Sequence, residues 1–183
     1  MFACLVPASN ISAVSPILGK KYQNGVKNVT VWLNYNSGIG YWESYIKNVA
    51  NNWKNPGWSN PINLTFVSSN YGSNMDFHLK NKSFWGGSTS ILGQANYFLN
   101  GARIDPRTSN WYYAEIYINH DAFIKPSLTN DQALGTTIHE MGHAFGLDEY
   151  NTNKYSVMCQ LGAGRLVQRV QKTDNDAVKG LYP

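Results

Sequence analysis

The sequence is poor in cysteine and has no long apolar run, and each shortage excludes a class of protein. Two cysteines, Cys4 and Cys159, are too few for a disulfide framework or for a zinc site made of four cysteines. No apolar run approaches the ~20 residues that a transmembrane helix needs. We therefore expect a protein without a membrane span, whose hydrophobic fraction of 43% builds an ordinary globular core.

A cluster of basic residues is also missing. Lysine and arginine number 15 and give a net charge of +4, but only Lys20 and Lys21 are adjacent. Proteins that bind nucleic acids normally carry their basic residues as a patch or a stripe. We therefore expect no nucleic-acid partner.

The length of 183 residues fits one domain. The first eight residues, MFACLVPA, resemble the end of a secretory signal peptide with a small-residue cleavage site, although the usual charged start is missing. An irregular start is the alternative. We expect a leader remnant and N-terminal segment over residues 1–25, a folded domain over residues 26–183, a secreted or cell-surface location and a monomer.

The pattern of apolar residues predicts an α+β fold. Residues 42–53 carry apolar side chains at the i, i+3, i+4, i+7 spacing of an amphipathic helix. Five segments are typical of strands: 29–33, 62–67, 75–79, 91–98 and 112–118. This order predicts one mixed sheet with a helix on its face.

A second, clearer helix is predicted from about residue 129 to residue 145. Thr129 and Gln132 form a capping-box pattern, and Gly146 is a typical stop signal. A stripe of apolar residues at helical spacing is expected to face the core: Leu134, Ile138, Met141 and Phe145. A short closing helix is predicted after Thr173.

This helix carries the residues that indicate chemistry. Residues 139–143, HEMGH, match the H-E-x-x-H pattern of zinc metalloproteases. Positions i and i+4 lie above one another on a helix, so His139 and His143 can both reach one Zn²⁺ at about 2.0–2.1 Å. Glu140 lies beside that face, where it can act as a general base and not as a ligand.

The pattern extends beyond the helix. Residues 139–149, HEMGHAFGLDE, match H-E-x-x-H-x-x-G-x-x-H at every fixed position except the last. Gly146 allows the chain to leave the helix sharply and to return a third ligand to the metal. Residues 155–158, YSVM, then resemble the Met-turn that lies beneath the metal in metzincins.

Together these residues resemble the matrixin-type metzincins, over roughly residues 25–183. The resemblance implies one mixed, mostly parallel five-stranded sheet, a backing helix, an active-site helix and a C-terminal helix. It implies that Met158 supports the zinc site and that residues 159–172 wall the specificity pocket. It also implies an edge strand that binds an extended polypeptide substrate through these residues: Gly93, Gln94, Ala95 and Asn96.

The departure from the family lies at position 149, where a histidine is usual and this chain has Glu149. A carboxylate is still a good zinc ligand. The alternatives are Asp148 or Tyr150 as the third ligand, or no third protein ligand. His78 and His120 do not reproduce the structural zinc site of vertebrate matrixins, and Cys159 is expected to be a small buried hydrophobe.

The expected function is that of a secreted zinc-dependent endopeptidase, with zinc as its cofactor. Zn²⁺ would polarise the scissile carbonyl, and Glu140 would take a proton from water and pass it to the leaving amine. A zinc-bearing binding protein that has lost catalysis is the main alternative. A carbohydrate-binding module would rest only on the six Trp and twelve Tyr residues, which are equally typical of a core.

Overall fold

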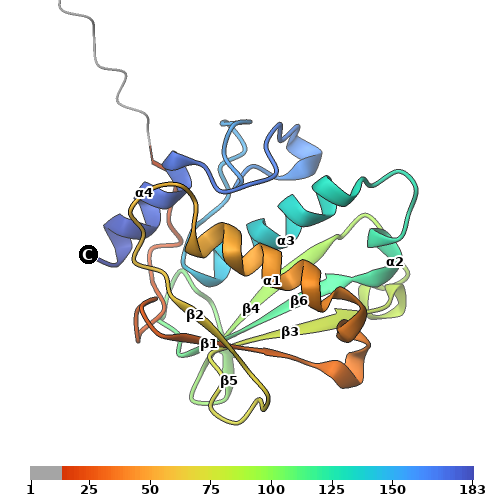
Figure 1. Ribbon diagram of the computed structural model, residues 1–183, viewed down its shortest axis with the longest axis horizontal. Coiled ribbons are helices and arrows are strands. Elements are labelled where there is room, and N and C mark those ends of the chain that lie inside the picture. The colour runs from red at the N-terminus through yellow and green to blue at the C-terminus, as the bar shows by residue number, and fades with distance from the viewer. Residues whose placement is uncertain (1–13) are drawn as a thin grey trace, which may run out of the picture.

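The computed structural model describes residues 14–183. The predicted signal-peptide end at residues 1–8 and Cys4 lie outside the described residues. The described chain is α+β, with one mixed sheet and helices packed on it (Figure 1). Its strands are β1 (Val29–Leu33), β2 (Leu64–Val67), β3 (Met75–Lys80), β4 (Gly93–Leu99), β5 (Ala102–Ile104) and β6 (Tyr113–Asn119).

The sheet has the strand order β2-β1-β3-β6-β4-β5. Strands β2, β1, β3 and β6 are parallel to one another, and β4 is antiparallel to both β6 and β5. The mixed, mostly parallel character agrees with the prediction. The predicted number of strands was wrong, because the sheet has six strands and not five.

The additional strand, β5, forms a hairpin with β4. The two strands are joined by Asn100 and Gly101, which have φ values of 52° and 78°. A two-residue turn with positive φ at both positions matches the right-handed twist of a hairpin, and Asn-Gly is its preferred sequence. Because β5 has only three residues and no buried side chain, its apolar pattern gave no signal, but the Asn-Gly pair did.

The described residues form four α-helices: α1 (Glu43–Lys54), α2 (His120–Phe123), α3 (Asn130–Ala144) and α4 (Lys172–Leu181). Short 3₁₀ helices lie at Tyr35–Ser37, Ile39–Trp42, Lys82–Trp85 and Leu161–Ala163. The two longest helices, α1 and α3, pack side by side in front of the sheet (Figure 1). No helix in residues 14–183 is long and apolar enough to cross a membrane.

The core fills the space between the sheet and these two helices. Trp53 of α1 is fully buried and donates its indole N–H to the carbonyl of Ile138 in α3, at 2.9 Å. Trp111 makes the same kind of bond to the carbonyl of Ala144, at 3.2 Å. Buried indoles normally find such partners, and here they fix α3 relative to α1 and to the segment before β6.

Helix α3 begins and ends as the sequence predicts. Thr129 and Gln132 form a complete capping box. Three residues of the predicted stripe are fully buried and Leu134 is partly buried: Ile138, Met141 and Phe145. The helix is therefore anchored by its apolar face, which leaves its last two turns to present polar side chains.

The chain before β1 also packs against the domain. Leu18 and Tyr22 are buried in the core. The backbone N–H of Tyr22 donates to the hydroxyl of Tyr182 at 2.9 Å. Residues 15–22 are thus part of the folded body.

Candidate metal centre

Two histidines on the last turns of α3 face one another. The Nε2 atoms of His139 and His143 are 3.0 Å apart, as expected for side chains at positions i and i+4. After α3 the chain reverses at Gly146, whose φ is +96°. A Cβ at Gly146 would also lie 3.3 Å from the carbonyl oxygen of Lys20, so both conformation and space favour glycine.

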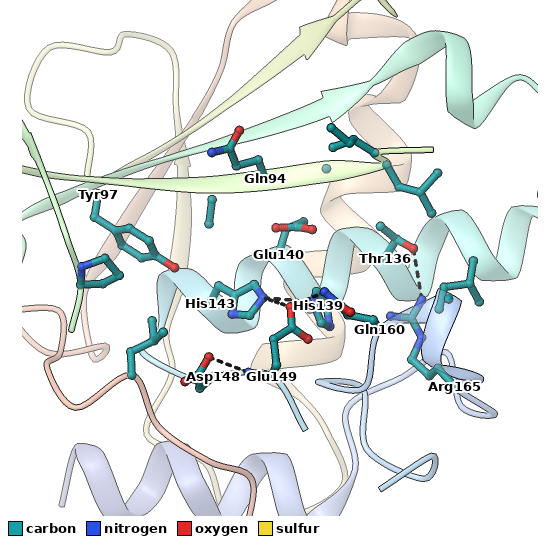
Figure 2. Close-up of a pocket in the computed structure, with 18 of the residues that line it drawn as sticks. Gln94, Tyr97, Thr136, His139, Glu140, His143, Asp148, Glu149, Gln160 and Arg165 are labelled. Carbon is teal, nitrogen blue, oxygen red and sulfur yellow. Dashed lines mark hydrogen bonds and ion pairs between the residues drawn. The ribbon is translucent and has the colours of Figure 1, made fainter. Parts of the chain in front are cut away.

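The reversal returns Glu149 to the histidines. Its Oε1 atom lies 3.4 Å from Nε2 of His139 and 3.3 Å from Nε2 of His143. Figure 2 shows the carboxylate pointing at both rings from below α3. Among residues 14–183 this is the one group of three or more metal-ligating side chains whose ligand atoms lie within 4.8 Å of one another.

The hydrogen bonds on the far side of each ring decide its tautomer. Nδ1 of His139 lies 2.9 Å from the carbonyl oxygen of Val157, and Nδ1 of His143 lies 2.8 Å from that of Leu147. A carbonyl oxygen only accepts, so both Nδ1 atoms carry the proton. In the neutral imidazoles each Nε2 then presents a lone pair to the centre.

In this tautomer the two Nε2 lone pairs converge with Oε1 of Glu149, which also accepts an N–H from the side chain of Gln160 at 3.0 Å. The second carboxylate oxygen of Glu149, Oε2, is buried and has no hydrogen-bond partner among the described residues. Acceptors packed in this way repel one another unless a positive charge lies between them. The arrangement fits a bound metal ion, held by His139, His143 and Glu149.

The electrostatics of Glu149 and His143 show which charges this centre favours. Burial would raise the pKa of the Glu149 carboxyl, but its hydrogen bonds and charge interactions with the two histidines hold this pKa well below its usual value. Burial would lower the pKa of His143, but Glu149 and Glu140 raise it above its usual value. The surroundings thus favour an anionic Glu149 facing positive charge.

The other candidates for the third ligand are engaged elsewhere. Both carboxylate oxygens of Asp148 accept hydrogen bonds from Arg107, at 2.8 Å, and one also accepts the backbone N–H of Glu149. Tyr150 packs against the core, and its backbone N–H donates to the carbonyl of Met158. Of the three residues that the sequence left open, the structure brings Glu149 to the histidines.

Glu140 lies next to this centre and has a free carboxylate. It is largely buried on α3 and forms no hydrogen bond or ion pair with any described residue. Its side chain packs on Gly93 of β4, where a Cβ would be only 2.8 Å from its Cγ. The carboxylate is therefore held in place by packing and is available to a bound molecule.

A cavity of about 620 Å³ opens over these residues. Three of the four predicted substrate-binding residues line it, from β4: Gly93, Gln94 and Ala95. The fourth, Asn96, is buried and does not line this cavity. The lining also includes Leu161 and Gly162, within the segment 159–172 that was expected to form the specificity pocket.

Part of β4 is an open edge. On the side away from β6, β5 pairs only with residues 97–99, so within the described chain residues 93–96 have no strand beside them. The N–H of Asn119 donates to the carbonyl of Leu92, and hydrogen-bonded pairs alternate along an antiparallel ladder. The N–H and C=O groups of Gly93 and Ala95 therefore point away from β6, toward the open edge.

Met158, the predicted Met-turn residue, packs against α3 between the two histidines. It is fully buried and its sulfur contacts Gly142, one residue before His143. Cys159 is a free buried thiol, in agreement with a small hydrophobe. His78 pairs with Asn34 and His120 packs near Trp42, so neither belongs to a metal cluster in residues 14–183.

Sequence reasoning missed Arg165. Its guanidinium is buried at the cavity wall and donates to the carbonyls of Val157 and Cys159 and to Oγ1 of Thr136 on α3 (Figure 2). These bonds tie the segment 157–159 to α3. No motif marks this arginine, because its acceptors are mostly backbone carbonyls.

Comparison with known proteins adds a distant structural likeness. No model of a protein family and no curated protein matches the sequence. Eighty chains of known structure match, and among them is the structure of myroilysin, with a TM-score of 0.44 and 18% sequence identity. The match covers 72% of this chain and 55% of that one, so this chain spans little more than half of the myroilysin structure.

Proposed function

We propose that the protein is a zinc-dependent endopeptidase of the metzincin type, with His139, His143 and Glu149 as the zinc ligands. The observation that carries this proposal is the convergence of two Nε2 lone pairs and a carboxylate beside a second, free carboxylate. Two histidines and a glutamate form a donor set used at catalytic zinc sites, where one position stays open. When bound, zinc polarises the scissile carbonyl and lowers the pKa of water.

Glu140 would act as the general base. Its carboxylate lines the cavity and has no competing donor among the described residues, so it can accept a proton from the attacking water. The same carboxyl would then donate that proton to the leaving amine. Packing against Gly93 limits the rotamers of the side chain, which keeps the carboxylate directed into the cavity.

The open edge of β4 would bind the substrate. An extended polypeptide can pair with the outward N–H and C=O groups of Gly93 and Ala95, as in other cases of β-strand addition. Such binding uses main-chain atoms and demands an unfolded or flexible segment. It therefore favours cleavage within polypeptides and makes little demand on sequence at the paired residues.

A non-catalytic zinc protein is the second candidate. A purely structural zinc site closes its fourth position with another protein ligand. No fourth ligand joins the cluster among residues 14–183, and Glu140 is left free beside it. These observations favour the peptidase.

The decisive experiment measures zinc and hydrolysis on the same preparations. We expect about one tightly bound zinc per chain and internal cleavage of an unfolded polypeptide, lost with a chelator and restored by Zn²⁺. Glu140→Gln should keep zinc and lose activity by about 10²-fold or more. Unchanged activity after verified removal of the metal would refute the proposal, and zinc binding without any hydrolysis would favour the second candidate.

A further inference from the structure

Residues 15–18, here termed the N-terminal brace, cross the loop that follows α3. Ile17 and Leu147 form an antiparallel bridge. On either side of it, the N–H of Leu18 donates to the carbonyl of Gly146 at 2.9 Å, and the N–H of Asp148 donates to the carbonyl of Pro16 at 2.8 Å. The brace thus fixes the backbone on both sides of Leu147.

Leu147 provides the carbonyl that orients His143. Its oxygen accepts the Nδ1 proton of that ring at 2.8 Å, while Leu147 itself is fully buried. Because the flanking residues Gly146 and Asp148 are both bonded to the brace, the direction of this carbonyl depends on the brace. One of the two metal-facing histidines is therefore oriented through the N-terminal segment.

The start of the brace reaches the other histidine through Asp174 in α4. Oγ of Ser15 donates to Oδ1 of Asp174 at 2.6 Å, and Oδ2 of Asp174 accepts the backbone N–H of Val157 at 3.1 Å. The carbonyl of Val157 in turn accepts the Nδ1 proton of His139. In Figure 1 the segment that begins at residue 14 runs beside α4.

Asp174 does more than cap its own helix. Capping requires only the bond that its Oδ2 atom accepts from the N–H of Gln171. Its carboxylate also accepts the hydroxyls of Ser15 and Ser156, from two other segments, and it is completely buried without an ion-pair partner among the described residues. The carboxylate therefore joins the brace, the Met-turn and α4 at one point.

We propose that Ser15 and Asp174 are positioning residues for the metal centre, through which the N-terminal brace sets the orientation of both histidines. This inference rests on the proposed metal site. Hydrogen-bond partners that orient metal-binding histidines typically change metal affinity by about 10–100-fold. Ser15 and Asp174 act one bond further out, on the segments whose carbonyls hold the rings, and neither residue lines the cavity.

The chain offers a matched control. Ser73 donates its hydroxyl to the buried carboxylate of Asp76 at 2.5 Å, in the segment that leads into β3. This pair is the same kind of bond, from a serine hydroxyl to an aspartate carboxylate, between two buried residues, but it contacts neither histidine. The comparison is therefore between Ser15→Ala and Asp174→Asn on one side and Ser73→Ala and Asp76→Asn on the other.

Zinc affinity, measured by competition with a chelator, is the main readout. We expect Asp174→Asn to bind zinc about tenfold or more weakly and Ser15→Ala several-fold more weakly. Both controls should keep the wild-type affinity within about twofold, whatever they cost in thermal stability. At saturating zinc the turnover of Ser15→Ala should return to near the wild-type value, because the hydroxyl has no part in the chemistry.

A second readout keeps the test independent of hydrolysis and of zinc. ¹⁵N NMR of the metal-free proteins should show the Nδ1–H tautomer for both histidines in the wild type and a mixture in Ser15→Ala. If Asp174→Asn does not fold, Ser15→Ala decides alone. Wild-type zinc affinity and tautomers in Ser15→Ala would overturn the inference, whereas a wild-type chain that binds no zinc would instead overturn the proposed function.

Discussion

Gly142 and Met158 are in direct contact across the base of the metal centre. A Cβ on Gly142 would overlap the sulfur of Met158 and lie 2.9 Å from Cζ2 of Trp53. Gly142 lies between the two histidines in the motif and faces Met158, so there is no space for a side chain at this position. This contact sets how closely α3 approaches Met158 and Trp53 of α1.

We expect Gly142→Ala to destabilise the protein by about 1–3 kcal/mol, since overpacking forces side chains or backbone to shift. Urea unfolding measures this cost. Gly180→Ala is the control, because Gly180 lies in α4 with nothing within 4 Å of a Cβ. There alanine should stabilise by up to about 1 kcal/mol through helix propensity. A neutral Gly142→Ala would mean that Met158 can move aside freely.

Glu149→Ala should weaken zinc binding, whereas Asp148→Ala should mainly weaken an ion pair. Removing Glu149 takes away the carboxylate that lies 3.3–3.4 Å from both histidines, so zinc affinity should fall steeply. Removing Asp148 breaks its partly exposed ion pair with Arg107, worth up to about 1 kcal/mol of stability, and the bond from the backbone N–H of Glu149, but it takes no carboxylate away from the histidines. Zinc titrations of the two variants decide the assignment, and loss of zinc in Asp148→Ala alone would show it to be wrong by one residue.

Gly93→Ala should impair catalysis without removing the metal. The added Cβ would lie 2.8 Å from Cγ of Glu140 and would displace the carboxylate that we propose as the general base. Turnover should fall by more than about tenfold, because a displaced carboxylate loses part of the rate acceleration that a general base provides. The zinc content should stay unchanged. Gly162→Ala serves as the control, because it lines the same cavity with open space around it. Equal kinetics for the two variants would contradict the assigned contact.

Arg165→Met should lower the free energy of unfolding by about 1–3 kcal/mol, because the carbonyls of Val157 and Cys159 would lose a charged donor while buried. Arg169→Met, at an exposed position four residues later, should cost less than about 0.5 kcal/mol. Denaturant unfolding of both variants makes the comparison. Equal stability would show that solvent or other donors replace the guanidinium.

The parts of the fold that follow from local pattern could be predicted. Helix α3 has a capping box, an apolar stripe and a terminal glycine, and all three appear in the structure. Strand β5 could not be found from its apolar pattern, because tertiary pairing with β4 and not burial of side chains makes it a strand. Its turn, Asn100–Gly101, was the available signal.

The candidate site also has features that the sequence predicts and features that it does not. The spacing of His139 and His143 is a property of one helix, so the sequence predicts their meeting. The choice between Asp148 and Glu149 depends on Arg107, 41 residues away from Asp148, which engages that carboxylate. The groups that orient both rings are backbone carbonyls, which every residue has, so no residue type could reveal them.

A metal bound as we propose at His139, His143 and Glu149 would also link the abundance of the folded chain to the supply of metal. A ligand that binds only the native state stabilises it by mass action, by about 4 kcal/mol when its free concentration is a thousand times the dissociation constant. For a domain of this size that is a large share of the total stability. A cell or medium that starves the chain of metal would therefore lose the protein itself to unfolding and turnover, and not only the chemistry at His139, His143 and Glu149.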